Sequence, residues 1–193
     1  MKILNITASV QGDNSVSRQL ATKLANKLAG SEGTVINRDL SEGVSLLTGE
    51  MVGSFYTPPA DRTAAQTAII IPSENLVEEL KDADSIVIGF PIYNFSVPST
   101  LKSYLDLIAR VGVTFKYSEK GPEGLLENKK VYLVVTSGGT EVESDADFAT
   151  NYTKHFLAFL GLTDVKVISV GQLMIPTATE TVKAANDKID AIA

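Results

Sequence analysis

The chain contains no cysteine among its 193 residues. Disulfides, thiolate nucleophiles, cysteine-ligated iron–sulfur clusters and cysteine-based zinc sites are therefore excluded, and the composition fits a reducing cytoplasm. The one histidine, His155, falls in a predicted helix, where a surface or interface role is more common than catalysis. Without a second histidine or any cysteine, no metal cluster is visible, and we expect no metal cofactor.

Long apolar runs and basic clusters are also lacking. No run approaches the roughly 20 residues that a membrane span needs, and the apolar start is too short for a signal peptide, so we expect a cytoplasmic protein without a membrane partner. The 17 basic and 23 acidic side chains give a formal net charge of -6. Such a surface repels phosphate backbones, which disfavours nucleic acid as a partner. The length suits a single domain over residues 1–193.

Buried strands alternate with amphipathic helices along the chain. Strands are predicted at residues 1–7, 35–40, 85–90, 130–136 and 165–170. Helices are predicted at residues 16–28, 99–108, 148–160 and 179–192, with a further helical pattern that runs towards Ala83. This order predicts an α/β fold, a three-layer sandwich whose five-stranded parallel sheet has helices on both faces.

The region between the second and third strands is harder to interpret. Residues 46–52 are compatible with a short helix, and Pro58–Pro59 predict a break in regular structure. Pro72 is expected to break or restart the helix that runs towards Ala83, and Ser73 is a candidate cap for its second part.

Ligands of such sheets bind at the carboxyl ends of the strands, which directs attention to three strand-to-helix loops. The first loop, residues 9–17, offers the hydroxyls of Ser9, Ser15 and Ser17 beside a helix N-terminus, a combination suited to a phosphate. The alternative is that Asn14 or Ser15 only caps the helix. The loop has no Gly-x-Gly-x-x-Gly and no Walker lysine, so dinucleotide and nucleoside-triphosphate sites are disfavoured.

The second loop, residues 91–98, places Tyr93 and Phe95 around an amide beside a rigid proline. This composition suits a flat heteroaromatic ring, whose edge Asn94 can both donate to and accept from. The alternative is a hydrophobic loop that packs on its own helix, which we disfavour because a buried asparagine needs a partner.

The third loop is Ser137–Gly138–Gly139–Thr140. Paired glycines allow close approach of the backbone to a ligand, and their N–H groups can stabilise negative charge on a reduced ring. The alternative is a flexible turn. Further along the sequence than the second loop, residues 113–117 alternate like a strand and lead into a predicted turn at residues 121–124.

One long ordered match ties these features together. It runs from Pro91-Ile92-Tyr93-Asn94-Phe95 through residues 101–106 and 112–117 to residues 121–125, with weaker similarity over nearly the whole chain. In these segments the sequence resembles the FMN-dependent NADH:azoreductase family, also described as NADH:quinone oxidoreductases.

The resemblance implies a flavodoxin-like sheet, a homodimer, non-covalent FMN, NADH as electron donor, and quinones or azo compounds as acceptors. It places Ser9 and residues 15–17 (Ser15, Val16, Ser17) at the phosphate. It places Pro91 and residues 92–95 along the flavin ring and residues 137–140 at its pyrimidine end. Phe115 and Tyr117 then belong to the acceptor pocket, as a hairpin reaching across subunits. In one departure, many family members have Ser-Arg-Gly-Gly where this chain has Ser137-Gly138-Gly139-Thr140.

The implied mechanism is ping-pong, with hydride passing from NADH to FMN and then to the acceptor on the same face. The flavin carries this chemistry, so no catalytic protein residue is expected. Three alternatives stay open from the sequence: an FMN reductase acting on nitroaromatic or other acceptors, a flavodoxin-type electron carrier, and a binding module for an unrelated phosphate ligand.

Overall fold

The computed structural model describes residues 1–176 and 178–192. Its strands, in chain order, are β1 (Lys2–Thr7), β2 (Thr34–Asp39), β3 (Ser85–Pro91), β4 (Phe115–Ser118), β5 (Gly121–Gly124), β6 (Lys130–Thr136) and β7 (Asp164–Val170). Its α-helices are α1 (Val16–Ala29), α2 (Gly49–Tyr56), α3 (Ala64–Asp82), α4 (Ser99–Ile108), α5 (Phe148–Phe159) and α6 (Ala178–Asp190). No helix within the described residues is long and apolar enough to cross a membrane.

Five of the strands form one parallel sheet in the order β2-β1-β3-β6-β7, and β4 and β5 form a separate antiparallel hairpin. The predicted five-stranded parallel sheet is therefore confirmed. After β1 the chain adds β2 on one side and then crosses to add β3 on the other, so the strand order reverses between β1 and β3. Open α/β sheets bind ligands beyond the carboxyl ends of the strands at such a reversal.

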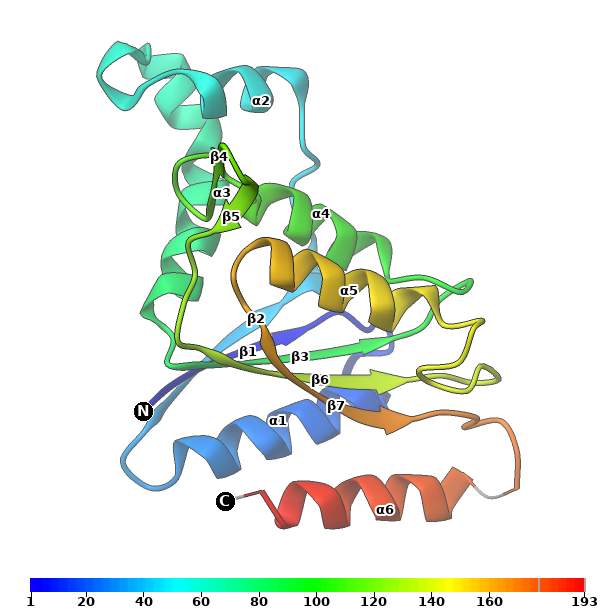
Figure 1. The fold of residues 1–193 in the computed structure, drawn as a ribbon. Coiled ribbons are helices and arrows are strands. Elements are labelled where there is room, and N and C mark those ends of the chain that lie inside the picture. Colours follow the sequence, from blue (N-terminus) through cyan, green and yellow to red (C-terminus); the bar gives the residue numbers. More distant parts are fainter. Residues whose placement is uncertain (177, 193) are drawn as a thin grey trace.

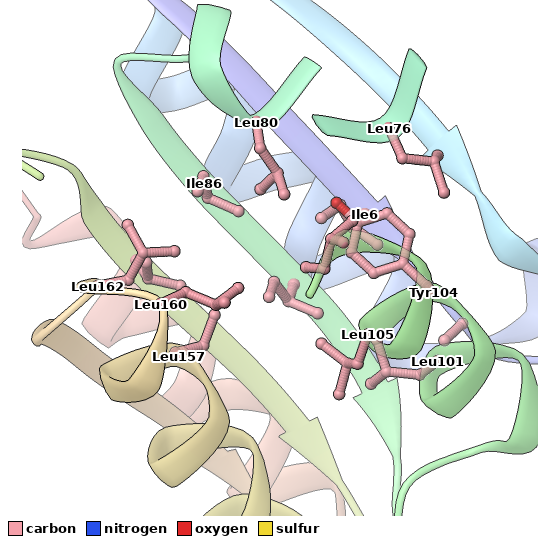
Figure 2. Close-up of a cluster of buried hydrophobic side chains, with 14 of the residues drawn as sticks. Ile6, Leu76, Leu80, Ile86, Leu101, Tyr104, Leu105, Leu157, Leu160 and Leu162 are labelled. Carbon is pink, nitrogen blue, oxygen red and sulfur yellow. The ribbon is translucent and has the colours of Figure 1, made fainter. Parts of the chain in front are cut away.

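Helices cover both faces of this sheet (Figure 1). One apolar cluster joins α1 and α6 to the face that Ile3 and Val87 point into. The other joins α3, α4 and α5 to the opposite face, which the next residues of the same strands, Leu4 and Ile88, point into. Figure 2 shows leucines of α3, α4 and α5 gathered around Ile6 and Ile86 on this second face. Because neighbouring residues on β1 and β3 point into different layers, nearly every position of these strands is buried, rather than every second one.

A glycine lets α1 lie directly against the centre of the sheet. A Cβ at Gly89 of β3 would lie 2.6 Å from the Ala21 Cβ and 2.8 Å from the Ser17 carbonyl oxygen. Leu20 and Leu24 are buried beside this contact, as the helical spacing predicts. The close approach brings the N-terminus of α1 to the carboxyl end of β3.

The prediction that Pro72 breaks its helix is wrong, since α3 continues through it from Ala64 to Asp82. Pro72 is exposed, so the Ala68 carbonyl that loses its helical donor faces the water side of the helix. Ser73 does not cap a second helix. It is fully buried inside α3, where its hydroxyl donates to the Leu107 carbonyl at 2.6 Å and accepts from Arg110 at 2.7 Å, which ties α3 to the end of α4.

Two other local predictions are corrected. The short helix lies at Gly49–Tyr56 rather than at residues 46–52, because the Thr48 hydroxyl caps it by accepting from the Met51 N–H at 3.2 Å. Pro59–Asp61 form one turn of 3-10 helix rather than no regular structure, with proline at its first position, where no N–H is needed.

The predicted turn at residues 121–124 is strand β5, paired with β4 from Phe115↔Gly124 to Ser118↔Gly121. A Cβ at Gly124 would lie only 2.0 Å from the Gly161 nitrogen. Gly124 is therefore required by close backbone packing against the end of α5 rather than by a turn.

Candidate functional site

A cleft of about 420 Å³ opens at the carboxyl edge of the sheet, beside the reversal of strand order. Four strand ends contribute to it. Its lining residues are Ser9, Gln11, Ser15, Val16, Pro91, Ile92, Tyr93, Thr136, Ser137, Gly138, Leu173 and Met174. The three loops predicted from composition therefore meet in space, and a fourth, after β7, joins them.

The loop after β1 brings the N-terminus of α1 to this cleft. The Ser15 hydroxyl caps the helix by accepting from the Arg18 N–H at 3.3 Å, and it lies 3.0 Å from the Ser17 hydroxyl. The Ser9 hydroxyl accepts from the Gln11 N–H at 3.3 Å. Ser15 therefore has the capping role that the sequence left as an alternative, while it also lines the cleft. Ser17 is fully buried and does not line it.

An ion pair holds the first turn of α1 against the neighbouring strand end. Arg18 donates from Nη2 to the Asp39 carboxylate at the end of β2 at 2.8 Å, and to the Ser9 carbonyl at 3.4 Å. Burial raises the pKa of the Asp39 carboxyl, but hydrogen bonds from Arg18 and Ser41 outweigh this effect and leave the pKa below its ordinary value. The guanidinium therefore faces a carboxylate at neutral pH and braces the loop that carries Ser9.

The loop after β3 is a tight two-residue turn. Tyr93 and Ser96 exchange both backbone hydrogen bonds at 3.0 Å, and Asn94 and Phe95 between them have φ of 50° and 68°. Left-handed backbone is tolerated by asparagine but strained for phenylalanine. Asn94 is exposed, so the expectation of a buried asparagine in need of a partner is wrong. Strain of this kind persists where the surrounding structure enforces it, often at ligand sites.

The turn also borders a second hollow, which has a volume of about 520 Å³. It is lined by Tyr93, Asn94, Ser96, Val97, Pro98, Ser99, Lys102 and Tyr152. Lys102 is paired there with Asp106 at 2.6 Å, one helical turn along α4, as their spacing suggests. Tyr93 lines both hollows.

The loop after β6 is an ordered turn. The Ser137 N–H donates to the Val170 carbonyl at 3.0 Å, and the Ser137 hydroxyl accepts from the Thr140 N–H at 2.8 Å. Within the described residues, the N–H groups of Gly138 and Gly139 donate to no protein acceptor. Gly138 lines the cleft, whereas Gly139 and Thr140 do not.

Residues 171–175, after β7, form a wall of the cleft that composition did not indicate. The Leu173 N–H donates to the Ser137 carbonyl and the Met174 N–H to the Gly138 carbonyl, both at 2.9 Å. This loop could have been found from the predicted topology rather than from its composition, because the carboxyl ends of all strands in a parallel sheet reach the same edge.

The predicted acceptor-pocket residues, Phe115 and Tyr117, lie on the β4–β5 hairpin and do not line the cleft. Phe115 is buried against Phe159 of α5, with ring centroids 4.4 Å apart. Tyr117 contacts Phe115 edge to face at 5.5 Å and is 65% exposed. His155 is exposed on α5, as its place in the helix suggested.

Known proteins with the same organisation show what this chain is similar to. An FMN-dependent NADH:quinone oxidoreductase 1 from Jannaschia sp. (strain CCS1) is 47% identical over 192 residues, covering 99% of this chain and 98% of that protein. An FMN-dependent NADH:quinone oxidoreductase from Erythrobacter litoralis (strain HTCC2594) is 41% identical over 193 residues, covering 99% and 98%. Among solved structures, an azoreductase from Bacillus anthracis str. Sterne aligns with a TM-score of 0.88 at 26% identity, covering 98% and 96%. The model of the family described as flavodoxin-like fold matches residues 1–193 in full, and the chain belongs to that family.

Proposed function

We propose that this protein is an FMN-dependent NADH:quinone oxidoreductase that also reduces aromatic azo compounds. The observation that carries the proposal is the cleft at the reversal of strand order, with a helix N-terminus at one end and an aromatic turn at the other. FMN has the matching parts, an anionic phosphate and a flat ring. Two relatives that align over nearly the whole chain are FMN-dependent NADH:quinone oxidoreductases by name.

The residues around the N-terminus of α1 fit a phosphate. The helix dipole and the free N–H groups of a first turn favour an anion, and Val16 and Ser15 lie on the cleft at this point. In the proposal Ser9 and Ser15 donate to phosphate oxygens. Ser17 acts from beneath, because its buried hydroxyl lies 3.0 Å from that of Ser15 and can hold it in place.

The two loops beyond fit a heteroaromatic ring. Pro91, Ile92 and Tyr93 give an apolar floor along one side of the cleft. Asn94 and Phe95 are held in left-handed backbone and do not line the cleft themselves. In the proposal they flank the ring edge from the turn beside it. In the proposal the loop of residues 137–140 lies at the pyrimidine end of the ring, where negative charge develops on reduction, and the N–H groups of Gly138 and Gly139 are the ones left to face that charge.

When bound, FMN supplies two-electron acceptance and donation, so the chain needs no nucleophile of its own. The role left to the protein is to bind the phosphate, orient the ring and stabilise charge at its polar edge. Because one wall of the cleft is the sheet edge itself, only one face of a bound ring stays open. NADH and the acceptor must then use that face in turn, which predicts ping-pong kinetics.

We also propose that the protein works as a homodimer with the acceptor pocket at its interface. Tyr117 on the hairpin and Phe148 at the start of α5 are 65% and 63% exposed, and contact with a second copy would remove these rings from water. Neither lines the cleft of its own chain, so a second copy is the natural place for Tyr117 to act. Sedimentation at micromolar concentration tests this, and a monomer with full turnover would contradict it.

The decisive experiment is anaerobic reduction of the purified protein by NADH, and separately by NADPH, followed by mixing with a quinone, an azo dye or a nitroaromatic compound. A yellow protein that releases FMN on denaturation and is reoxidised fastest by a quinone is the expected result. FMN that NADH does not reduce would indicate an electron carrier instead. A colourless protein that takes up no FMN on reconstitution would overturn the proposal.

A further inference from the structure

The side chain of Met174 covers the backbone of Gly138 at the edge of the cleft. A Cβ at Gly138 would lie 3.1 Å from the Met174 Sδ and 3.3 Å from its Cγ. The backbone hydrogen bond from the Met174 N–H to the Gly138 carbonyl, at 2.9 Å, fixes the two residues side by side. The absence of a side chain at Gly138 thus leaves the space that the thioether takes.

Met174 is also the most exposed methionine in the described chain. Met174 is 87% exposed, Met1 is 54% exposed and Met51 is 5% exposed. The sequence has three methionines and no cysteine, so any oxidation of protein sulfur must fall on a thioether. Of the three, Met174 alone lines the cleft at the carboxyl edge of the sheet.

Resting on the proposed function, we propose that Met174 is a modification site at which hydrogen peroxide converts the thioether to a sulfoxide, and that this change weakens FMN binding in the cleft. A sulfur lone pair attacks one peroxide oxygen, the S–O bond forms and the O–O bond breaks. The sulfur is oxidised by two electrons while the peroxide is reduced to water. Hydrogen peroxide is the two-electron reduction product of dioxygen, and a bound flavin would be able to supply those two electrons under aerobic conditions.

The physical basis is the change in polarity at a contact surface. A thioether is apolar and polarizable, and it makes favourable contacts with aromatic rings. A sulfoxide is polar and chiral and disrupts apolar contacts. At the edge of a cleft that holds a flat ring, the sulfoxide replaces an attractive contact with a group that prefers water.

The test treats the FMN-loaded protein with hydrogen peroxide, removes the excess with catalase and maps oxidation by peptide mass spectrometry. The same samples are stripped of FMN and titrated with it, following flavin fluorescence. We expect Met174 to be oxidised well before Met51. The Kd for FMN should rise by about two- to thirteenfold, the range that sulfur–aromatic contacts represent.

Two variants isolate the residue. The Kd of Met174→Leu for FMN is measured before and after peroxide treatment, and the two values should be the same. Met51→Leu, which removes a buried methionine, should keep the full response to peroxide. The inference fails if Met174 resists oxidation in the loaded protein, if its sulfoxide leaves the Kd unchanged, or if Met174→Leu responds like the wild type. Failure of the untreated wild type to bind FMN would instead overturn the proposed function, and this inference with it.

Discussion

Replacing Ser15 with alanine tests whether the serine loop serves the cofactor or only the helix. The Ser15 hydroxyl lines the cleft, accepts from the Arg18 N–H at 3.3 Å and lies 3.0 Å from the Ser17 hydroxyl. The hydrogen bond from the Arg18 N–H is a helix cap, whereas the side of the hydroxyl that faces the cleft is where a phosphate oxygen would lie. Loss of the cap lowers the stability of the fold, and loss of a phosphate contact lowers the affinity for FMN.

The cap is worth less than the proposed phosphate contact. Loss of an N-cap costs typically about 1 kcal/mol of stability. At 3.3 Å the Ser15 cap is longer than an ordinary N–H···O bond, so its loss should cost no more than that. A hydrogen bond to a charged group is worth about 1.5–3 kcal/mol. Ser15→Ala should therefore weaken FMN binding by roughly 10- to 150-fold.

The assay measures urea unfolding of the apoprotein and FMN dissociation on the same variants. Thr48→Ala is the matched control, because the Thr48 hydroxyl caps α2 with a 3.2 Å bond from the Met51 N–H, away from the cleft. It should lose similar stability and keep its FMN affinity. Ser17→Ala should lower FMN affinity less than Ser15→Ala, and the double variant should lose less than the sum, since the two hydroxyls touch. If Ser15→Ala behaves like Thr48→Ala in both measurements, these serines serve the helix and not the cofactor.

Two further predictions concern packing and pH. Gly124→Ala should lower the free energy of unfolding by about 3 kcal/mol in urea, because its Cβ would meet the Gly161 nitrogen at 2.0 Å. A Cβ at Gly49, at the start of α2, would have no atom within 4 Å, so Gly49→Ala should instead raise the free energy of unfolding by up to about 1 kcal/mol. Equal urea midpoints for the two variants would refute the close packing at Gly124. Asp39→Asn should lose about 1–2 kcal/mol at pH 7 by breaking the pair with Arg18. Since the pKa of Asp39 is lowered in the folded state, the stabilisation by this ion pair is fully present above about pH 4 and declines as the pH falls further. The difference in free energy of unfolding between wild type and Asp39→Asn should therefore be smaller at pH 3 than at pH 7. An equal difference at both pH values would contradict the prediction.

The layered sheet could be predicted because its signals are local and repeated. The run from Ser85 to Phe90 is apolar at nearly every position, which marks a strand covered on both faces. The spacing of Leu20 and Leu24 gives α1 one buried face. Short strands alternating with such helices leave few arrangements other than a parallel sheet with helices on both sides.

The errors arose where a distant contact overrides a local rule. Pro72 breaks isolated helices, but α3 continues because Ser73 is hydrogen-bonded to Leu107 of α4 and to Arg110 just after that helix. Gly124 has the composition of a turn, yet it lies in β5 because another backbone passes against it. The residues that Ser73 and Gly124 contact lie far away along the sequence, so the local sequence pattern could not predict the unbroken helix or the strand.

The site shows the same division between composition and topology. Serine, aromatic and glycine loops were visible as separate signals, but Met174 lies in a loop with no such composition. It joins the site because β7 ends at the same edge as β1, β3 and β6. Asn94 was selected because its amide can both donate and accept, but the supporting argument that it is buried was wrong, since it is exposed. Its left-handed backbone is the feature that the sequence did not reveal.

The strand ends around the cleft are joined to one another by backbone hydrogen bonds. The Ala8 N–H donates to the Gly89 carbonyl at 3.0 Å, and the Ile92 N–H donates to the Thr136 carbonyl at 2.8 Å. The Ser137 N–H donates to a β7 carbonyl at 3.0 Å, so the connection passes through all four strand ends. Loops fixed in this way lose little further freedom when a ligand binds, and preorganisation favours affinity by lowering that cost. A change in one loop should therefore reach its neighbours, so we expect variants at Gly138 or Met174 to alter the proposed cofactor site beyond their own loops.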